Sequence, residues 1–132
     1  MNEQLSQLAE AMRREIKAIP QTMRQETVIR QALVCLLYQA VKQMGLIPLA
    51  GWKPPRSTRE GIDLVGVDAS GELPRVQIAF VVDPLVELPR LKALEWVDCE
   101  DKVVVSFSER ADKVKQSSFF LTPAHTHLNL HP

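Results

Sequence analysis

The stretch of residues 61–82, GIDLVGVDASGELPRVQIAFVV, limits the possible folds more than any other part of the sequence. Two apolar runs, 62–67 and 76–82, flank a polar turn at 69–71. Runs rich in Val and Ile on either side of a Gly-containing turn are typical of a β-hairpin. Asp63 is the exception, because it places a carboxylate inside the first strand. The sequence therefore predicts a hairpin with one acidic side chain among apolar neighbours.

Two helices are predicted ahead of this hairpin. Residues 2–19 repeat apolar side chains at helical spacing along one narrow stripe, and Pro20 ends this helix. Thr22 and Gln25 form a capping-box pattern that predicts the start of a second helix, which ends at Gly45. Because the second helix is apolar around much of its circumference, we expect it to be the central and most buried helix.

The remaining segments complete an α/β pattern. Residues 46–52 are a short extended piece, and the prolines and small polar residues that follow predict a loop. Pro89 fits the first turn of a third helix. Residues 102–108 are almost continuously apolar, as expected for a strand covered on both faces. Short extended pieces follow near the C-terminus, so the order of elements predicts an α/β fold with a mixed β-sheet flanked by helices.

The composition indicates one domain without a strong charge. The chain has 132 residues, and its 16 basic and 16 acidic residues cancel. This balance does not support nucleic acid as a partner, because phosphate neutralisation dominates such binding. No apolar run approaches the roughly 20 residues of a membrane helix, and the polar N-terminus does not resemble a secretory signal. We therefore expect no membrane partner. Cys35 and Cys99 have no CxxC spacing, so we expect reduced thiols and a cytoplasmic location.

Strand alternation indicates where chemistry could lie. Asp63 is expected to share one face of the sheet with Gln77 and Ala79 of the neighbouring strand. A carboxylate and an amide oxygen can both ligate a hard cation such as Mg²⁺. Glu26 lies near the axis of the apolar stripe of the second helix, so we expect it to point at the protein. The alternative is that the helix dipole alone favours an acid at this position.

These segments resemble the core of the PD-(D/E)XK nuclease superfamily, which has the restriction-endonuclease-like fold. The resemblance covers residues 22–107 and consists of a helix that opens with a glutamate, QETVIRQALVCLLYQAVKQMG, followed by GIDLVGVD, RVQIAFVV, a helix and KVVVSFS. It implies a single nuclease-like domain over residues 1–132. Residues 1–19 would be an extra N-terminal amphipathic helix, and residues 108–132 a C-terminal extension.

The resemblance also implies a site, from which this sequence departs. In that family a helix glutamate, a strand aspartate and an acid-x-lysine motif on the next strand hold a divalent metal and activate water against a phosphodiester. Glu26 and Asp63 match the first two elements by position, whereas QIA at 77–79 replaces acid-x-lysine. The loss of a charge-stabilising donor commonly lowers rates by about 10²–10³. Lys92 on the following helix could reach over the sheet instead, or could lie on its solvent face.

Three functions remain open. The leading hypothesis is a catalytically degenerate nuclease-like domain with a binding or assembly role. In this hypothesis residues 2–19 either pack against a second copy or another protein, or cover the sheet of their own chain. The second is an active Mg²⁺-dependent nuclease with a rearranged site made of Glu26, Asp63, Gln77 and Lys92, the first three as metal ligands. The third is a small α/β protein-interaction module unrelated to nucleases.

Two further groups of residues have both a functional and an ordinary interpretation. The loop before Asp63 contains a basic group, which could form a rim to the site or be solvated: Lys53, Arg56 and Arg59. The C-terminal tail contains a histidine group: His125, His127 and His131. Its first two members are spaced by two residues, which puts both on one face of a strand, a geometry that zinc sites can use. Without an evident third ligand, a solvated tail is the alternative.

Overall fold

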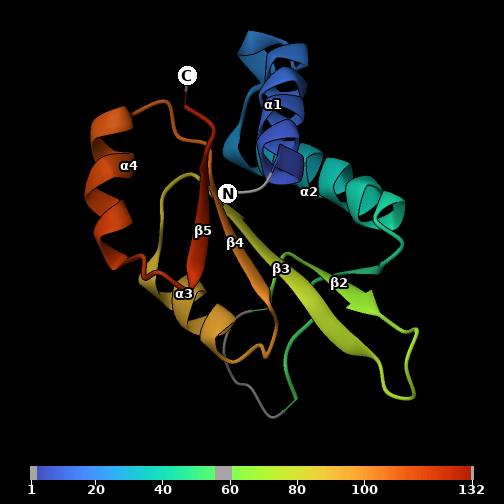
Figure 1. The fold of residues 1–132 in the computed structure, drawn as a ribbon. Helices are drawn as coiled ribbons and strands as arrows, with labels where there is room; N and C mark the ends of the chain where they lie inside the picture. The colour runs from blue at the N-terminus through green and yellow to red at the C-terminus, as the bar shows by residue number, and fades with distance from the viewer. Residues whose placement is uncertain (1–2, 56–60, 132) are drawn as a thin grey trace.

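The sheet has an antiparallel half and a parallel half. The computed structural model describes residues 3–55 and 61–131. Within these ranges the strands are β1 (Ile47–Ala50), β2 (Leu64–Asp68), β3 (Arg75–Asp83), β4 (Asp101–Ser106) and β5 (His125–Asn129). They lie side by side in sequence order (Figure 1). Pairing is antiparallel from β1 to β3 and parallel from β3 to β5.

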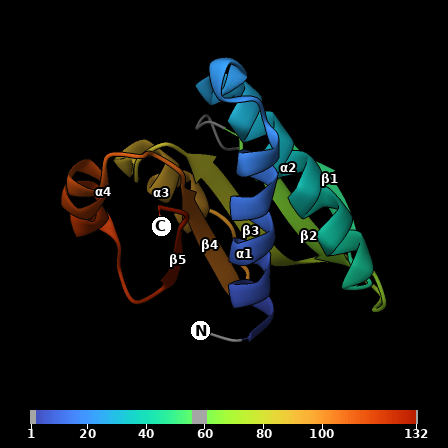
Figure 2. The same cartoon turned by 90° about the horizontal axis from the view of Figure 1, so that it is seen from above.

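Helices cover both faces of this sheet. They are α1 (Glu3–Ala18), α2 (Glu26–Gln43), α3 (Leu88–Glu95) and α4 (Ala111–Ser117), with 3-10 turns η1 (Gln21–Met23) and η2 (Ser118–Phe120). α1 and α2 lie on one side of the sheet, and α3 lies on the other with α4 beside it (Figure 2). The α/β class and the mixed sheet predicted from the sequence are therefore confirmed. None of the described helices is long and apolar enough to cross a membrane.

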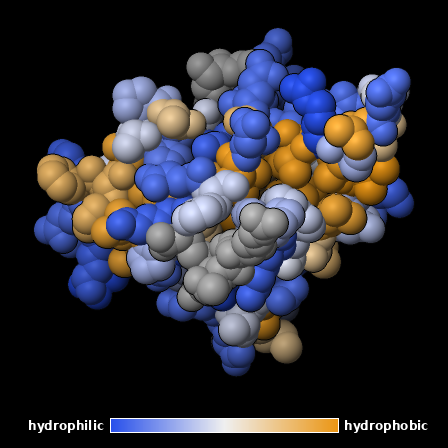
Figure 3. All heavy atoms as spheres, turned by 90° about the horizontal axis from the view of Figure 1, so that it is seen from below, coloured by the Kyte–Doolittle hydropathy of each residue, from blue (hydrophilic) through white to orange (hydrophobic). Residues whose placement is uncertain are grey.

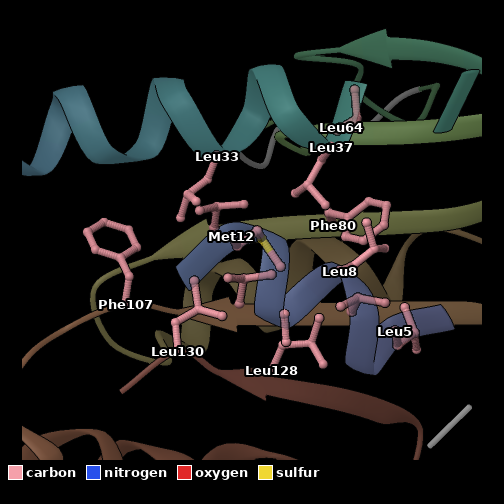
Figure 4. Close-up of a cluster of buried hydrophobic side chains, with 14 of the residues drawn as sticks. Leu5, Leu8, Met12, Leu33, Leu37, Leu64, Phe80, Phe107, Leu128 and Leu130 are labelled. Carbon is pink, nitrogen blue, oxygen red and sulfur yellow. The ribbon is translucent and has the colours of Figure 1, made fainter. Parts of the chain in front are cut away.

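α1 buries its apolar stripe against the sheet of its own chain. Leu5, Leu8 and Met12 of α1 are buried in one core cluster. In Figure 4 they meet side chains from α2 and from the strands, among them Leu33, Leu37, Leu64, Phe80 and Leu128. Of the two expectations for this helix, the structure shows the second, in which it covers its own sheet. The apolar stripe is therefore already occupied within the chain.

α2 is less buried than its sequence predicts. Only Leu33, Leu37 and Val41 are fully buried in it, whereas Val28 and Cys35 are exposed. The reason is its position: α2 lies over the antiparallel half of the sheet and packs against α1 along one side only. The expectation that α2 is the most buried helix is therefore wrong.

The second core cluster lies between the sheet and α3. Val65, Ala79 and Val81 face Leu91 and Leu94 of α3 there. Residues 79–83 of β3 and 103–106 of β4 are buried without alternation, because these two strands have helices on both faces. This confirms the interpretation of the apolar run at 102–108. It also means that any polar group at the ends of β3 and β4 must find a partner inside the protein.

A glycine sets how closely α2 approaches the sheet. A Cβ atom at Gly66 would lie 2.8 Å from Cγ2 of Ile78 and 3.0 Å from both Cγ1 of Val41 and Cδ1 of Leu46. The pairing of β2 with β3 also shifts register between Gly66 and Val67. The hairpin is therefore irregular at this point, and counting side chains from its turn does not give the true neighbours across the strands.

β1 is an edge strand with one open face. Ile47 and Leu49 pair with Val67 and Val65, which belong to the cluster under α3, so all four side chains share one face. Ile47 is 49% exposed and Leu49 is 39% exposed. Hydrophobic side chains also reach the surface in patches on the side of the molecule seen in Figure 3. The face of β1 turned away from α2 is therefore largely open to solvent.

Two element boundaries differ from those predicted. Thr22 lies in η1, a 3-10 turn that follows Pro20, so α2 begins only at Glu26 with Gln25 as its N-cap residue. Asp63 lies just before β2 and not inside it. Its side chain still turns to the α3 side of the sheet, the side of Val65, where it bonds to Arg90.

The C-terminal part contains a helix that the sequence does not predict. α4 buries only Val114, so it lacks the apolar stripe by which a helix is recognised. Residues 118–120, expected to be extended, form the turn η2. β5 confirms the other extended piece near the C-terminus, and it pairs with β4 in parallel.

Candidate functional site

Asp63 is paired with an arginine of α3 at the carboxyl end of β3. Its Oδ2 accepts a hydrogen bond from the backbone N–H of Val82 at 2.6 Å. The same oxygen accepts a charge-assisted bond from Nη2 of Arg90. Nη1 of Arg90 donates to the carbonyl oxygen of Gly61 at 3.1 Å. Both the carboxylate and its guanidinium partner are thus fixed by the backbone around them.

Asp83, the last residue of β3, bonds to the same arginine. Nε of Arg90 donates to Oδ2 of Asp83 at 2.9 Å. Oδ1 of Asp83 accepts a bond from Nη2 of Arg30 at 3.0 Å, and Nε of Arg30 donates to the carbonyl oxygen of Val82 at 3.0 Å. Acids and bases therefore alternate in the order Asp63, Arg90, Asp83, Arg30, which we call the arginine–carboxylate network.

The arginine–carboxylate network is sheltered from water. Asp83 is 5% exposed and Arg90 is 9% exposed, and the Asp63 side chain is 16% exposed. Burial raises the pKa of Asp63 above its ordinary value, while the guanidinium of Arg90 and the N–H of Val82 act in the opposite direction. Breaking a buried ion pair by removing one partner commonly costs about 3–5 kcal/mol. The network therefore contributes to the stability of the fold, whatever its other role.

Gln77 does not lie beside Asp63. Val65, two residues after Asp63, pairs with Ala79, and both belong to the cluster under α3. Gln77 lies at the register shift of the hairpin, five residues (82 − 77) before Val82, or roughly 16 Å along the strand. The expected grouping of Asp63 with Gln77 is therefore absent from the structure. Ala79 does share the face toward which Asp63 turns.

Glu26 and Lys92 are both exposed. Residues 26–28 of α2 are all exposed, so the expectation that Glu26 points at the protein is wrong. Lys92 lies on the outer face of α3, which is the ordinary interpretation of that residue. The cation that reaches Asp63 from α3 is Arg90, two positions earlier. The structure thus brings none of Glu26, Gln77 and Lys92 to the carboxylate.

Three members of the arginine–carboxylate network are not singled out by the sequence. Asp83 ends an apolar run and precedes a proline, which signals the end of a strand and not a charge pair. Arg90 follows Pro89 in the first turn of α3 and stands four residues before Leu94, so helical spacing places it on the buried side of the helix, where a charge is not expected without a partner. The signal that could have found them is the presence of acids at the ends of two buried strands, since such groups need partners.

Two of the three histidine side chains form hydrogen bonds within the fold. Nε2 of His127 lies 2.7 Å from Oγ of Ser106 on β4, and Nδ1 of His125 accepts a bond from the N–H of Thr122 at 3.1 Å. Burial lowers the pKa of both histidines. They therefore belong to an ordered strand and not to a solvated tail. In the loop, Lys53 is exposed, and Arg56 and Arg59 lie outside the described residues.

The residues around Asp63 do not fit a divalent metal ion. No group of three or more His, Cys, Asp or Glu side chains in the described ranges is arranged to hold one. Asp63 and Asp83 are instead joined to guanidinium groups, and the methyl group of Ala79 offers no ligand. The metal centre that the family resemblance implies is therefore not supported by these side chains.

No family model, curated protein or solved structure matches this chain. The interpretation of the site therefore depends on the geometry of its own residues.

Proposed function

We propose that this chain is a catalytically degenerate nuclease-like domain with a binding or assembly role. The observation that carries the proposal is that one guanidinium group, that of Arg90, bonds to both Asp63 and Asp83. In PD-(D/E)XK nucleases a divalent cation supplies positive charge beside the strand aspartate. Here that charge belongs to the polypeptide itself.

The charge of Arg90 is permanent, and this favours a structural role over a catalytic one. A guanidinium cannot lose its proton inside a protein, so the two carboxylates are neutralised before any ligand arrives. A second, divalent cation would have to approach the arginine closely and would be repelled. Ala79 can neither ligate a metal nor orient water. We therefore interpret the arginine–carboxylate network as the remnant of a metal site that now stabilises the domain.

The two other hypotheses have less support. An active nuclease needs Glu26, Gln77 and Lys92 near Asp63, and these side chains lie elsewhere. An unrelated interaction module shares the binding role but predicts no affinity of the two aspartates for metal. Assembly through the stripe of α1 also has less support, since that stripe is buried in its own chain.

Replacing Arg90 with leucine tests the proposal. The Arg90→Leu variant keeps two neighbouring carboxylates without their shared cation, a pair that a divalent ion can bridge. We expect its melting temperature to lie below that of the wild type and to rise by several degrees, roughly, when millimolar Mn²⁺ is added, since binding to the folded state alone stabilises it. The melting temperature of the wild type should not respond to Mn²⁺ or Mg²⁺.

Matched variants make this experiment decisive. The double variant Arg90→Leu, Asp63→Asn lacks one carboxylate and should show no response to Mn²⁺. Circular dichroism establishes that each variant is folded, and Arg90→Gln replaces the leucine variant where it is not. A response of the wild type, together with cleavage of plasmid DNA, would favour the active nuclease. A folded Arg90 variant that ignores Mn²⁺ would remove the nuclease kinship and leave the interaction module.

A further inference from the structure

A small hollow opens where β4 and β5 end beside the C-terminal half of α1. Its volume is about 140 Å³. It is separate from the arginine–carboxylate network, and none of the residues named for that network lines it. In sheets with parallel strands, ligands bind in the crevice beyond the carboxyl ends of the strands. The hollow therefore lies at the end of the sheet at which open α/β folds bind ligands, although the order β3-β4-β5 has no reversal there.

The walls of the hollow are apolar. Ile16 of α1, Phe107 after β4 and Leu130 after β5 all line it. Phe107 and Leu130 are almost fully buried members of the core, so these walls are rigid parts of the fold. An engineered apolar cavity of about 150 Å³ in another protein binds benzene. The hollow thus has the size for one ring or one branched aliphatic group.

The rim of the hollow is cationic. Arg13, Lys17 and Arg24 line it with His131, against a single lining carboxylate, Glu109. Arg13 is paired with Glu10 at 2.7 Å, so the local excess of positive charge comes from Lys17 and Arg24. It contrasts with the chain as a whole, in which basic and acidic residues cancel. The rim therefore favours an anion over a neutral or cationic ligand.

Two of these cations are held in place by the backbone. Nε and Nη2 of Arg24 donate to the carbonyl oxygens of Ile19 and Lys17 at 2.9 and 3.2 Å. Nη2 of Arg13 donates to the carbonyl oxygen of Asn129 at 2.9 Å. A guanidinium has five N–H donors, so Arg24 keeps further donors for a ligand after these bonds are made. Groups fixed in advance lose less conformational freedom when they bind.

We propose that this hollow binds a small monocarboxylate whose apolar part is an aromatic ring or a branched aliphatic group. The apolar part would fill the space between Ile16, Phe107 and Leu130, and the carboxylate would lie against Lys17 and Arg24. Planar guanidinium groups match carboxylates in geometry as well as in charge. This site does not depend on the nuclease kinship and extends the binding role beyond it.

A titration with benzoate followed by NMR of the backbone amides tests this inference on the full chain. We expect benzoate to shift the resonances of residues 16–17, 107–108 and 130–131 in a saturable manner. Benzamide has the same ring without the charge, and acetate has the charge without the ring. Each should therefore have an affinity at least about tenfold lower than that of benzoate. Saturable shifts with this ranking support the proposal. No saturable shift with benzoate, equal binding of benzamide, or tighter binding of inorganic phosphate than of benzoate would each overturn it.

Two variants with one matched control locate the binding. Lys17→Gln removes an exposed rim charge and should weaken benzoate binding by about tenfold, since a bond to a charged group is lost. Arg24→Gln should weaken it at least as much. Lys92→Gln removes another exposed lysine, from α3, and should leave binding unchanged. Equal affinities in the wild type and both rim variants would show that the cationic rim does not recognise the carboxylate and would overturn the proposal.

Discussion

The two carboxylates of the arginine–carboxylate network are not equivalent. Asp83 accepts bonds from both Arg30 and Arg90, whereas Asp63 is bonded to Arg90 and to a backbone N–H. Removing Asp83 leaves two guanidinium groups short of a partner, while removing Asp63 leaves Arg90 still bonded to Asp83. A single side chain at the end of β3 therefore carries more of the charge balance than the aspartate that the sequence draws attention to.

We expect Asp83→Ala to lower the free energy of unfolding by about 3–5 kcal/mol, the range for breaking a buried pair. Asp63→Ala should lower it by less. Urea denaturation of both variants measures the two values. Asp98→Ala serves as the control, because that exposed aspartate lies outside the network and should change stability by no more than about 0.5 kcal/mol. A larger loss for Asp63→Ala than for Asp83→Ala would contradict the assignment of the central role.

At the scale of single residues, the sequence predicts part of the candidate site. Asp63 stands out because a charged group in an apolar run is rare, and it does belong to the site. The sequence raises the idea of a cation reaching it from the third helix, and the positions of Leu91 and Leu94 place Arg90, not Lys92, on the buried side of that helix. Alternation about a turn at 69–71 predicts that Gln77 lies beside Asp63. The strands are instead joined by residues 69–74, and the register shift after Gly66 adds one more residue, so Gln77 lies far along β3 from Asp63. The partner of a residue across a hairpin depends on the length of the loop, which alternation along one strand does not give.

Among the elements, the contact of α2 with β2 depends on the absence of a side chain at Gly66. The strand passes so close to α2 and β3 that the nearest atoms belong to Val41, Leu46 and Ile78. These are not the mobile tips of long side chains but branched groups in or beside the core. The hairpin and the helix before it can therefore approach one another only with glycine at this position.

Gly66→Ala is expected to destabilise the fold by about 1–3 kcal/mol, the usual range for overpacking a core. Gly71→Ala in the hairpin turn provides the comparison, since a Cβ there meets nothing within 4 Å. Thermal and urea unfolding of the two variants give the difference directly. Similar stabilities would mean that α2 can move away from the strand at little cost.

Elements with strong periodicity are the ones the sequence predicts. The stripe of α1 and the buried runs of β3 and β4 have patterns that follow from having one or two covered faces, and these elements were found where expected. The sequence does not predict α4, because its single buried residue makes no periodic pattern. α2 begins later than the capping-box pattern at Thr22 predicts, because η1, a turn held by the carbonyl of Pro20, intervenes. The sequence therefore predicts elements that are buried along a regular face, but it does not predict the short turns that connect them.

For the whole molecule, the half-buried His127 makes stability depend on pH. Its imidazole lies against Ser106 on β4, and burial lowers the pKa of His127, so the folded chain favours the neutral form. In the unfolded chain a histidine takes up a proton near pH 6.5. Below that pH the unfolded state binds more protons than the folded state, and the free energy of unfolding falls. The stabilisation is complete above this pH and is lost progressively in more acidic solution.

The wild type is therefore expected to lose more stability between about pH 7.5 and about pH 5.5 than the His127→Gln variant does. Urea denaturation at both pH values gives the two losses. His125, whose pKa burial also lowers, is present in both proteins and does not affect the comparison. The same holds for Asp63, whose raised pKa works in the opposite direction. Identical losses in the two proteins would mean that His127 is protonated as easily in the folded chain as in the unfolded one.

The contacts of Arg90 also affect how the chain unfolds. Its guanidinium touches the carbonyl before β2, the carboxylate beside it and the carboxylate that ends β3, and Arg30 extends the chain of contacts to α2. Detaching any one of these segments alone would leave a charged side chain without its partner in surroundings that solvate it poorly. The start of β2, the end of β3, α3 and α2 consequently separate together, as one cooperative unit, instead of fraying one after another.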